Sequence, residues 1–462
     1  MYGKIFMLRI RVTPALTSLI LGVVCSGIFA QEAPTKATWD FEQQALSNEW
    51  TAGGKIAVSR GKGEFPAKPE LKPKRPGDPI PEGQVATIDA QPGSHFALKQ
   101  ELPRIDWERA ERISFWVSRT PEEAKRDADC TLDLLFLDAA NRATFTRKVV
   151  ITGSGWQQVE IPVEWIAPTA GSVGSWPEVQ RLAISFFEES HLKLDALQAD
   201  LAAKPRAAIS LATMLPIAFP DSPAKAIKTV EREGYVVATN AADCDPAKVA
   251  DVLKPVLDQL AKELPLEPPV APARLLIFAS RAEYQKFPPR LAAQFVKEAA
   301  SPQSDGYTLL GWATSSWDEK QGIERPVFVH EFVHSVLESR LRLANSGEWF
   351  QEGLATHYQL QRYPQKNVPQ IILDGIAREQ FDLKALTSGK PIATTTYWQA
   401  ATLCSLLVRD PAYQPQLKGL IAAFRKSRST ALEPHLATVL KVDFDQLTTD
   451  WKKHCREAFP VK

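Results

Sequence analysis

The pattern of hydrophobic residues changes near Ala203, and this change constrains the fold of the 462-residue chain more than any other feature. Before it, short β-rich segments alternate apolar with polar residues between glycine, proline and asparagine, which is typical of antiparallel strands. After it, strands alternate with helical segments, and from about Arg325 nearly every segment has helical spacing. The sequence therefore predicts a multidomain protein, in which an antiparallel β-sandwich precedes an α/β lobe and an α-helical lobe.

The domain boundaries follow from the same pattern. We assign residues 31–203 to the sandwich, 204–225 to a proline-marked linker, and 226–462 to the second domain. Residues 65–82 contain six prolines and several lysines, so this segment is predicted to be an exposed loop between strands. The clearest sandwich strands are expected at 113–118, 131–137, 157–161, 182–187 and 192–196.

The first thirty residues have the layout of a secretory signal peptide. Three basic residues precede an apolar run from about residue 15 to 29, and the small Ala30 precedes a polar segment. The run is shorter than the ~20 residues that span a bilayer, which favours cleavage after Ala30 over an uncleaved anchor. Cys25 follows the bulky Val24, which argues against lipid attachment. We therefore expect a secreted, periplasmic or cell-envelope protein without a transmembrane segment after cleavage.

Net charge excludes one class of partner. Lysine plus arginine number 55 and aspartate plus glutamate 54, which gives a formal charge of +1. Residues 1–30 carry three basic and no acidic residues, so cleavage would bring the charge to −2. Without a basic excess to release counterions, we expect no nucleic acid partner.

Cysteine is sparse after the leader. Cys130, Cys244, Cys404 and Cys455 are too widely spaced for a disulfide scaffold or a zinc finger. Cys404 and Cys455 lie on neighbouring helical segments, so a disulfide between them and a pair of buried free thiols are both open.

One motif carries metal-binding chemistry: His330-Glu331-Phe-Val-His334. Residues four apart lie on one face of a helix, so both imidazoles can reach a single metal ion. Glu331 can act beside them as a general base on a water molecule. The surrounding residues are apolar, and a buried His-Glu-His patch without a partner would be unfavourable, whereas a metal ion supplies one.

Glu352 is the expected third ligand. It lies after His334 in a second helical segment, which begins after the turn around residues 345–347. A helix that returns antiparallel would bring this carboxylate beside the two imidazoles. Two histidines and one glutamate with an open fourth position form the ligand set of a catalytic zinc rather than a structural one.

The motif and the block Trp-Phe-Gln-Glu-Gly-Leu-Ala at 349–355 resemble the gluzincin group of zinc metallopeptidases, in particular the peptidase-MA-like domains of secreted bacterial proteins. The resemblance covers residues 220–462 loosely and 324–358 specifically. It implies Zn²⁺ bound by both histidines and Glu352, with Glu331 as catalytic base and a protein or peptide as substrate.

The same resemblance implies two further features. Tyr397, at the head of a later helical segment, matches a family tyrosine-glutamine motif, which implies that it stabilises the oxyanion; a packing role at the start of the helix is the alternative. Residues 306–312 are similar to the edge strand that lines the cleft in such enzymes, where a peptide can add as a strand. The chain lacks a recognisable amine-anchoring exopeptidase motif, which favours endopeptidase action.

The first domain resembles jelly-roll, galactose-binding-like modules of carbohydrate-binding proteins. This similarity rests on residues 39–42, 113–117, 155–162 and 192–195. It implies a glycan or cell-surface ligand, for which Trp50, Trp116, Trp156 and Trp165 are candidate stacking residues if they are not core. A structural Ca²⁺ held by Asp40, Glu42 and Asp195 is a further expectation, with ordinary surface or turn acids as the alternative.

Three functions remain open at this point. The first is a secreted zinc metallopeptidase with an accessory binding module. The second is a zinc hydrolase of non-peptide bonds, because a zinc site does not identify the bond. The third is a non-catalytic glycan-binding protein with a degenerate peptidase scaffold, although a scaffold has no need to retain all four site residues.

Overall fold

In the computed structural model, the described residues are 36–39, 41, 49–66, 71–99, 105–120, 129–169, 174–205, 209–269 and 271–460. The predicted signal peptide at 1–30 lies outside them, as do Asp40 and Glu42. Within the described part of the chain, no helix has both the length and the apolar character needed to cross a membrane.

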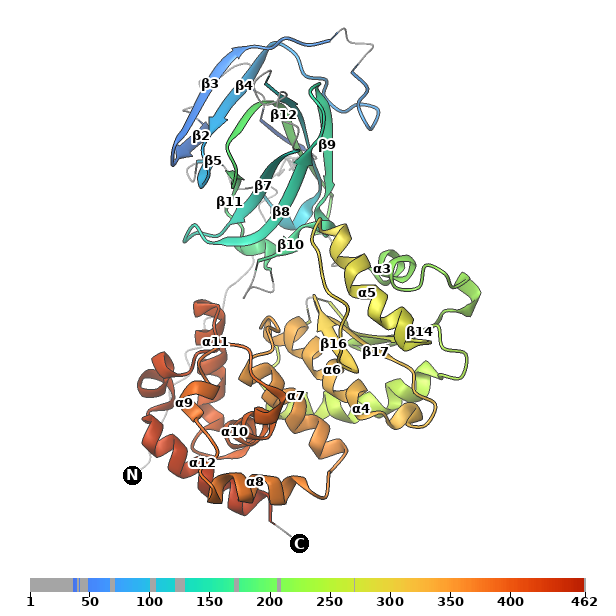
Figure 1. Cartoon of the computed structure of the whole chain (residues 1–462), viewed down its shortest axis with the longest axis vertical. Coiled ribbons are helices and arrows are strands. Elements are labelled where there is room, and N and C mark those ends of the chain that lie inside the picture. The colour runs from blue at the N-terminus through green and yellow to red at the C-terminus, as the bar shows by residue number, and fades with distance from the viewer. Residues whose placement is uncertain are drawn as a thin grey trace, which may run out of the picture. The chain divides into compact units, whose positions relative to one another are not determined.

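Two antiparallel sheets form the N-terminal sandwich (Figure 1). The first sheet, sheet A, has the order β3-β4-β12-β6-β9, with β1 also paired to β12, and the second, sheet B, has the order β10-β8-β7-β11-β5-β2. The five strands predicted most clearly are confirmed as β6, β7, β9, β11 and β12. Sheet A comprises β1 (Lys36–Trp39), β3 (Ile56–Lys62), β4 (Gln84–Ala90), β6 (Ala110–Arg119), β9 (Gln157–Pro162) and β12 (Ser190–Leu201); sheet B comprises β2 (Trp50–Gly53), β5 (Ser94–Leu98), β7 (Cys130–Leu137), β8 (Ala143–Ile151), β10 (Ala167–Pro168) and β11 (Arg181–Phe186).

The core between the sheets follows from alternation along the strands. In β6, Ile113, Phe115 and Val117 point into the apolar core, so Arg112 and Trp116 face the other side of sheet A. These outward residues are nevertheless buried. A segment outside the sheet must therefore cover this face.

The covering segment is the proline-rich strap, which we define as the described residues 63–66 and 71–83 between β3 and β4. These residues form a loop, as predicted, but the expectation that the segment is exposed is wrong for the part that contacts sheet A. Asp78 accepts hydrogen bonds of 2.5 and 2.8 Å from Arg112, and the carbonyl of Pro79 accepts one of 2.9 Å from Trp116 Nε1. Proline suits this segment because it needs no ladder hydrogen bonds.

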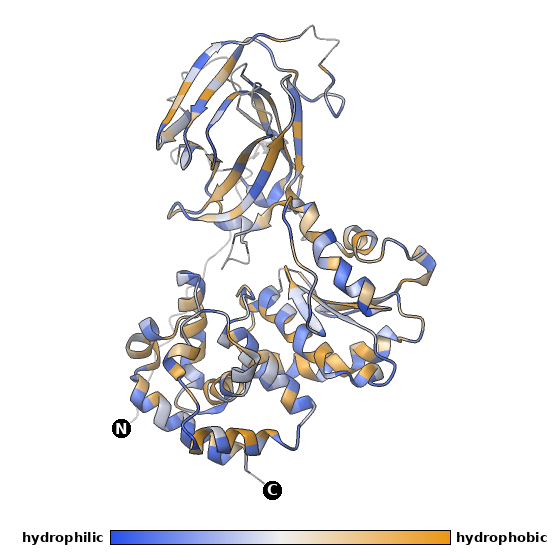
Figure 2. Ribbon diagram, in the orientation of Figure 1, coloured by the Kyte–Doolittle hydropathy of each residue, from blue (hydrophilic) through white to orange (hydrophobic). Residues whose placement is uncertain are grey.

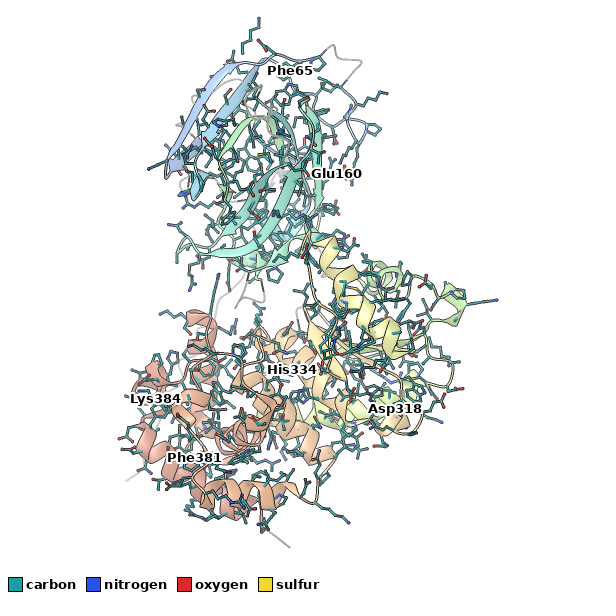
Figure 3. The ribbon with its side chains drawn as sticks, viewed as in Figure 1. Phe65, Glu160, Asp318, His334, Phe381 and Lys384 are labelled. Carbon is teal, nitrogen blue, oxygen red and sulfur yellow. The ribbon has the colours of Figure 1, made fainter. Side chains whose placement is uncertain are left out.

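The tryptophans named for sugar stacking divide into two groups. Trp50 and Trp116 are buried, with Trp50 stacked on Phe96 at 4.4 Å between ring centroids. Trp156 and Trp165 are partly exposed, and Trp156 lies against Phe65, which is labelled in Figure 3. Packing therefore removes Trp50 and Trp116 as exposed stacking platforms.

Asp195 is the one predicted calcium ligand that the structure describes. Its carboxylate accepts hydrogen bonds from the backbone amides of Ala196, at 2.7 Å, and Glu82, at 3.2 Å. The calcium site stays a prediction, because the other two ligands lie outside the described residues.

A five-stranded sheet of order β13-β14-β15-β17-β16 forms the α/β lobe. Strands β14, β15 and β17 are parallel, whereas β13 and β16 pair antiparallel at the two edges. The edge position predicted for residues 306–312 is confirmed for β16, and the chain then turns into β17. The elements are α3 (Leu211–Ala218), β13 (Lys228–Arg232), β14 (Tyr235–Thr239), α4 (Pro246–Glu263), β15 (Ala273–Phe278), α5 (Arg281–Gln294), β16 (Gly306–Leu309) and β17 (Trp312–Ser316).

Helix α3 lies inside the predicted linker 204–225. Its Met214 and Ala218 are buried in the same apolar cluster as Leu276 of β15 and Leu291 of α5. This segment therefore contributes to the core of the α/β lobe.

Helices make up the rest of the chain, as the spacing after residue 325 predicts. Figure 2 shows helices such as α8 and α12 with both apolar and polar residues on their surfaces, which is typical of helices packed on one side. The four described cysteines are buried and free, so Cys404 and Cys455 form no disulfide. The elements are α6 (Pro326–Val336), a π-helical turn (Leu337–Leu341), α7 (Trp349–Arg362), α8 (Val368–Ala377), α9 (Leu383–Leu386), α10 (Tyr397–Arg409), α11 (Leu417–Ser427) and α12 (Phe444–Ala458).

Candidate metal centre

Helix α6 presents the two histidines of the motif on one face. Pro326 occupies its first position, where a missing N–H costs no helical hydrogen bond. The apolar residues of the helix are buried in the core, including Phe328 and Phe332. The His330 side chain is 13% exposed and that of His334 is 2% exposed, so the site opens to solvent on the His330 side.

Glu352 of α7 joins the two histidines, as predicted. Its Oε2 lies 3.2 Å from His330 Nε2 and 3.6 Å from His334 Nε2, and the two Nε2 atoms lie 3.2 Å apart. Ligands about 2.1 Å from a tetrahedral zinc ion are about 3.4 Å from one another. The three atoms therefore have both the chemistry and the spacing of a zinc ligand set.

The start of α7 is fixed by a buried carboxylate. Glu348 caps the helix, since its side chain accepts hydrogen bonds from the backbone amides of Phe350 and Gln351 at 2.8 and 3.1 Å. The hydroxyl of Thr430 donates a further bond of 2.6 Å to the same carboxylate. These contacts set the first turn of α7, which carries Glu352.

Gly353 lets α7 approach α10 closely. A Cβ atom at this position would lie 2.6 Å from the carbonyl oxygen of Ala400 and 2.6 Å from the Cys404 sulfur, both on α10. No real Cβ tolerates such contacts, so the glycine after Glu352 is required by helix packing. The close approach also brings Tyr397, at the head of α10, near the metal ligands.

Gln351 defines the tautomer of His334. The Gln351 Nε2 group donates a 2.6 Å hydrogen bond to the carbonyl of Leu343, which turns Oε1 toward His334 Nδ1 at 3.1 Å. An amide oxygen only accepts, so Nδ1 carries the proton. His334 Nε2 then points at His330 and Glu352, so its lone pair has the orientation that a metal ligand needs once this nitrogen is deprotonated.

The carboxylate of Glu352 dominates the electrostatics of the site without a metal. Burial alone would lower the pKa of His334, but the hydrogen bond and negative charge of Glu352 raise it to about 9. Burial likewise opposes ionisation of Glu352, yet the hydrogen bonds from both histidines hold its pKa well below the ordinary value. The three groups thus attract positive charge, which a proton or a metal cation can supply.

Glu331 faces strand β16 of the α/β lobe. Its Oε2 accepts a hydrogen bond of 2.9 Å from the hydroxyl of Thr308. Burial raises the pKa of Glu331 above the ordinary value for a carboxyl group. Gly306 lies against the same side chain, because a Cβ there would be 2.6 Å from Glu331 Cγ.

Tyr397 lies beside the metal ligands, as predicted. Its ring is nearly parallel to that of His330, with 6.3 Å between centroids. Burial and the negative charge of Glu352 raise its pKa above the ordinary value of tyrosine. The hydroxyl is therefore protonated at neutral pH and able to donate a hydrogen bond.

His357, which lies beyond Glu352 on α7, takes no part in this cluster. It is buried, its Nε2 is hydrogen-bonded to the Gln361 side chain, and burial lowers its pKa to about 3. Within the described ranges, His330, His334 and Glu352 form the one group of potential metal ligands.

Sequence patterns identified four site residues, but they missed the residues that hold these side chains in place. The four are His330, Glu331, His334 and Glu352. Gln351 stands inside the block at 349–355, so its place before Glu352 was a usable signal. Thr308 gave no signal, because nothing in its local sequence indicates that it reaches a helix 23 residues later.

Comparison with known proteins gives structural similarities of limited extent. No family model matches the chain, and no curated protein matches it. The family 11 carbohydrate-binding module of the cellulosomal cellulase Lic26A-Cel5E of Clostridium thermocellum is similar over 37% of this chain and 96% of the module, with 14% identity and a TM-score of 0.26. The CBM22-1 xylan-binding domain from Paenibacillus barcinonensis Xyn10C is similar over 36% of this chain and 93% of that domain, with 14% identity and a TM-score of 0.25.

A third similar structure is CsCBM6-3 from Clostridium stercorarium in complex with cellobiose. The similarity covers 36% of this chain and 94% of that protein, with 14% identity and a TM-score of 0.22. Similarities this low carry no argument about a ligand, and the sandwich fold rests on the strand pairing described above.

Proposed function

We propose that this chain is an exported zinc-dependent peptidase, with His330, His334 and Glu352 as metal ligands and Glu331 as general base. The observation that carries the proposal is the convergence of three ligand atoms at zinc spacing, 3.2–3.6 Å, with a carboxylic acid on the adjoining helix position. A zinc ion bound there would supply a Lewis acid that polarises a substrate carbonyl and lowers the pKa of water to about 7.

The proposed chemistry assigns one proton transfer to Glu331. Its carboxylate takes a proton from the attacking water molecule and delivers it to the departing amine as the peptide C–N bond breaks. Tyr397, protonated at neutral pH, donates a hydrogen bond to the carbonyl oxygen as negative charge develops on it. Gln351 keeps His334 in the tautomer that a metal ligand requires.

Strand β16 supports a peptide as the substrate class. It pairs with β17 on one side and ends the described sheet on the other, so its outer backbone groups can pair with an extended chain. Thr308 of the same strand contacts Glu331, so a peptide added there would run beside the general base. This favours a peptidase over a hydrolase of other bonds, and an internal peptide bond over a chain end.

For the sandwich we propose an accessory role in binding glycan or cell-surface material. Trp156 and Phe65 supply a partly exposed aromatic pair, 5.1 Å between ring centroids, on which a sugar ring can stack. Retention by insoluble polysaccharides that falls on Trp156→Ala substitution would support this role. Equal retention of both proteins would exclude this pair as the binding surface.

The decisive experiment compares the wild type with Glu331→Gln. Both proteins are loaded with zinc, their metal content is measured, and both are incubated with a proteome-derived peptide library whose products are identified by mass spectrometry. We expect about one zinc per chain in both, cleavage by the wild type, and at least a 100-fold lower rate for the variant. Equal cleavage by the variant would show that Glu331 is not the base, and a zinc-loaded wild type that cleaves nothing would contradict the peptidase proposal.

A further inference from the structure

Strand β16 holds the side chain of Glu331 in one orientation. The Thr308 hydroxyl lies 2.9 Å from Glu331 Oε2 and 3.1 Å from the main-chain oxygen of the same residue. In the described part of the chain, no other donor is hydrogen-bonded to this carboxylate. One oxygen of the base is therefore engaged by the strand, and Oε1 remains free.

Gly306 adds a second constraint from the same face of β16. A Cβ atom at this position would lie 2.6 Å from Glu331 Cγ and 2.7 Å from Oε1. Residues 306 and 308 share a face because side chains alternate along a strand. The Thr308 hydroxyl thus bonds to Oε2, and the absence of a side chain at Gly306 leaves room for Oε1.

The strand is itself anchored to α6 one helical turn further on. Ser335 donates a 2.6 Å hydrogen bond to the carbonyl of Gly311, in the turn between β16 and β17. The Ser335 hydroxyl oxygen also accepts a 2.8 Å bond from the backbone amide of Arg274 on β15. Because Gly306 at the start of β16 and Gly311 just after its end both contact α6, Thr308 is fixed relative to Glu331 by the fold rather than by one side chain.

We propose that Thr308 is the positioning residue for the general base, and that it acts through Glu331 without contacting the metal ligands. This inference rests on the proposed function, since it assigns a role in that same site. A free glutamate side chain has several rotamers, and a misplacement of about 1 Å in a catalytic group can lower the rate about 100-fold. The hydrogen bond from Thr308 selects the rotamer in which Oε1 can receive a proton.

The matched substitutions are Thr308→Val, which keeps the shape and removes the hydroxyl, and Thr308→Ser, which keeps the hydroxyl. With a quenched peptide that the wild type cleaves, we expect Thr308→Val to lower kcat about 10- to 100-fold at unchanged KM and zinc content. Thr308→Ser should stay within about threefold of the wild type, by the same reasoning. A Thr308→Val protein with wild-type kcat, or a Thr308→Ser protein as impaired as the valine variant, would overturn the proposal.

Crystal structures of the zinc-loaded wild type, Thr308→Val and Gly306→Ala proteins give a readout that does not depend on activity. We expect the Glu331 carboxylate to leave its wild-type position in both variants, while the metal ligands stay in place. An unmoved carboxylate in Thr308→Val would overturn the proposal. If the carboxylate moves but the wild type cleaves no peptide, the positioning role stands and the proposed peptidase function fails.

Discussion

The protein buries two clusters of polar side chains, and they satisfy their charges in different ways. On sheet A, Arg112 bonds to Asp78 at 2.5 Å and to Asp200 at 2.5 Å, so its guanidinium is surrounded by carboxylates of the chain itself. At the candidate metal centre, His330 Nε2, His334 Nε2 and Glu352 Oε2 converge within 3.2–3.6 Å of one another. In the first cluster the cation is a permanent guanidinium, whereas in the second it is a proton on His334, which a metal ion could replace.

The difference separates a structural cluster from a candidate functional one. A guanidinium has donors in a planar fork that carboxylates fill, and Gln158 supplies a further bond of 2.8 Å to Asp78. Nothing is gained there by adding a ligand. A buried cluster of two imidazoles and a carboxylate with shifted pKa values is a candidate functional site, because a cation that replaces the proton could bind there.

The largest expected effect of breaking the sheet A cluster is on stability. Arg112→Met leaves the buried Asp78 and the partly buried Asp200 without their cation, which should lower the free energy of unfolding of the sandwich by about 3–5 kcal/mol. Hydrogen exchange of the strand β6 and β12 amides in the full chain measures this change. Zinc content should not alter, and a loss of zinc binding would contradict the separation of the two clusters.

The second expected effect is a dependence of folding stability on pH. Its direction is opposite in the two clusters. Without metal, the raised pKa of His334, about 9, contributes stability that is fully present below the ordinary value of 6.5. About 3 kcal/mol of stability should therefore be lost as the pH rises from 6.5 to 9. The lowered pKa of Asp78, caused by Arg112, stabilises the sandwich above the ordinary 3.8 and is lost as the pH falls through its folded-state value.

Urea unfolding of the metal-free protein at pH 6 and pH 9.5, followed by hydrogen exchange in α6 and α7, tests the first direction. Glu352→Gln removes the carboxylate that raises the His334 pKa, so this variant should show little of the alkaline loss. Bound zinc should also suppress it, because the ligands are then held deprotonated. An alkaline loss of equal size in Glu352→Gln would disprove the assigned cause.

The smallest effect compares two glutamines of helix α7 that are each hydrogen-bonded to a buried histidine. Gln351 orients His334, whereas Gln361 bonds His357 away from the cluster. Gln351→Leu should weaken zinc binding about 10- to 100-fold, because the tautomer of a ligand is no longer fixed. Gln361→Leu should leave zinc affinity unchanged. Competition with a chromophoric chelator measures both, and equal affinities in the two variants would show that His334 needs no partner.

The metal centre could be predicted from sequence because its key spacings are short. His330 and His334 are one helical turn apart, and only a short connection, residues 337–348, separates their helix from that of Glu352. Helical periodicity and the capping and turn residues between the helices are enough to bring these groups together. The sandwich strands were predictable for a similar reason, since alternation is local.

Contacts between distant segments could not be predicted in this way. Asp78 was placed in an exposed loop because prolines and lysines surround it, yet Arg112 on β6 buries it. The hydroxyl of Thr308 and the absence of a side chain at Gly306 affect Glu331 only because β16 packs against α6. Such contacts depend on tertiary packing, for which local propensity carries no information.

The close contact of Gly306 with Glu331 also has a consequence for recognising homologues that have lost activity. A homologous chain can keep both histidines and both glutamates, hold zinc, and still carry a side chain at the position of Gly306. In that chain the glutamate of the motif would be forced from its place, so the metal would be retained and turnover lost. A survey of homologues should therefore record this glycine separately from the motif. The motif indicates whether the candidate metal ligands are retained, and the glycine indicates whether the side chain of the proposed base has room.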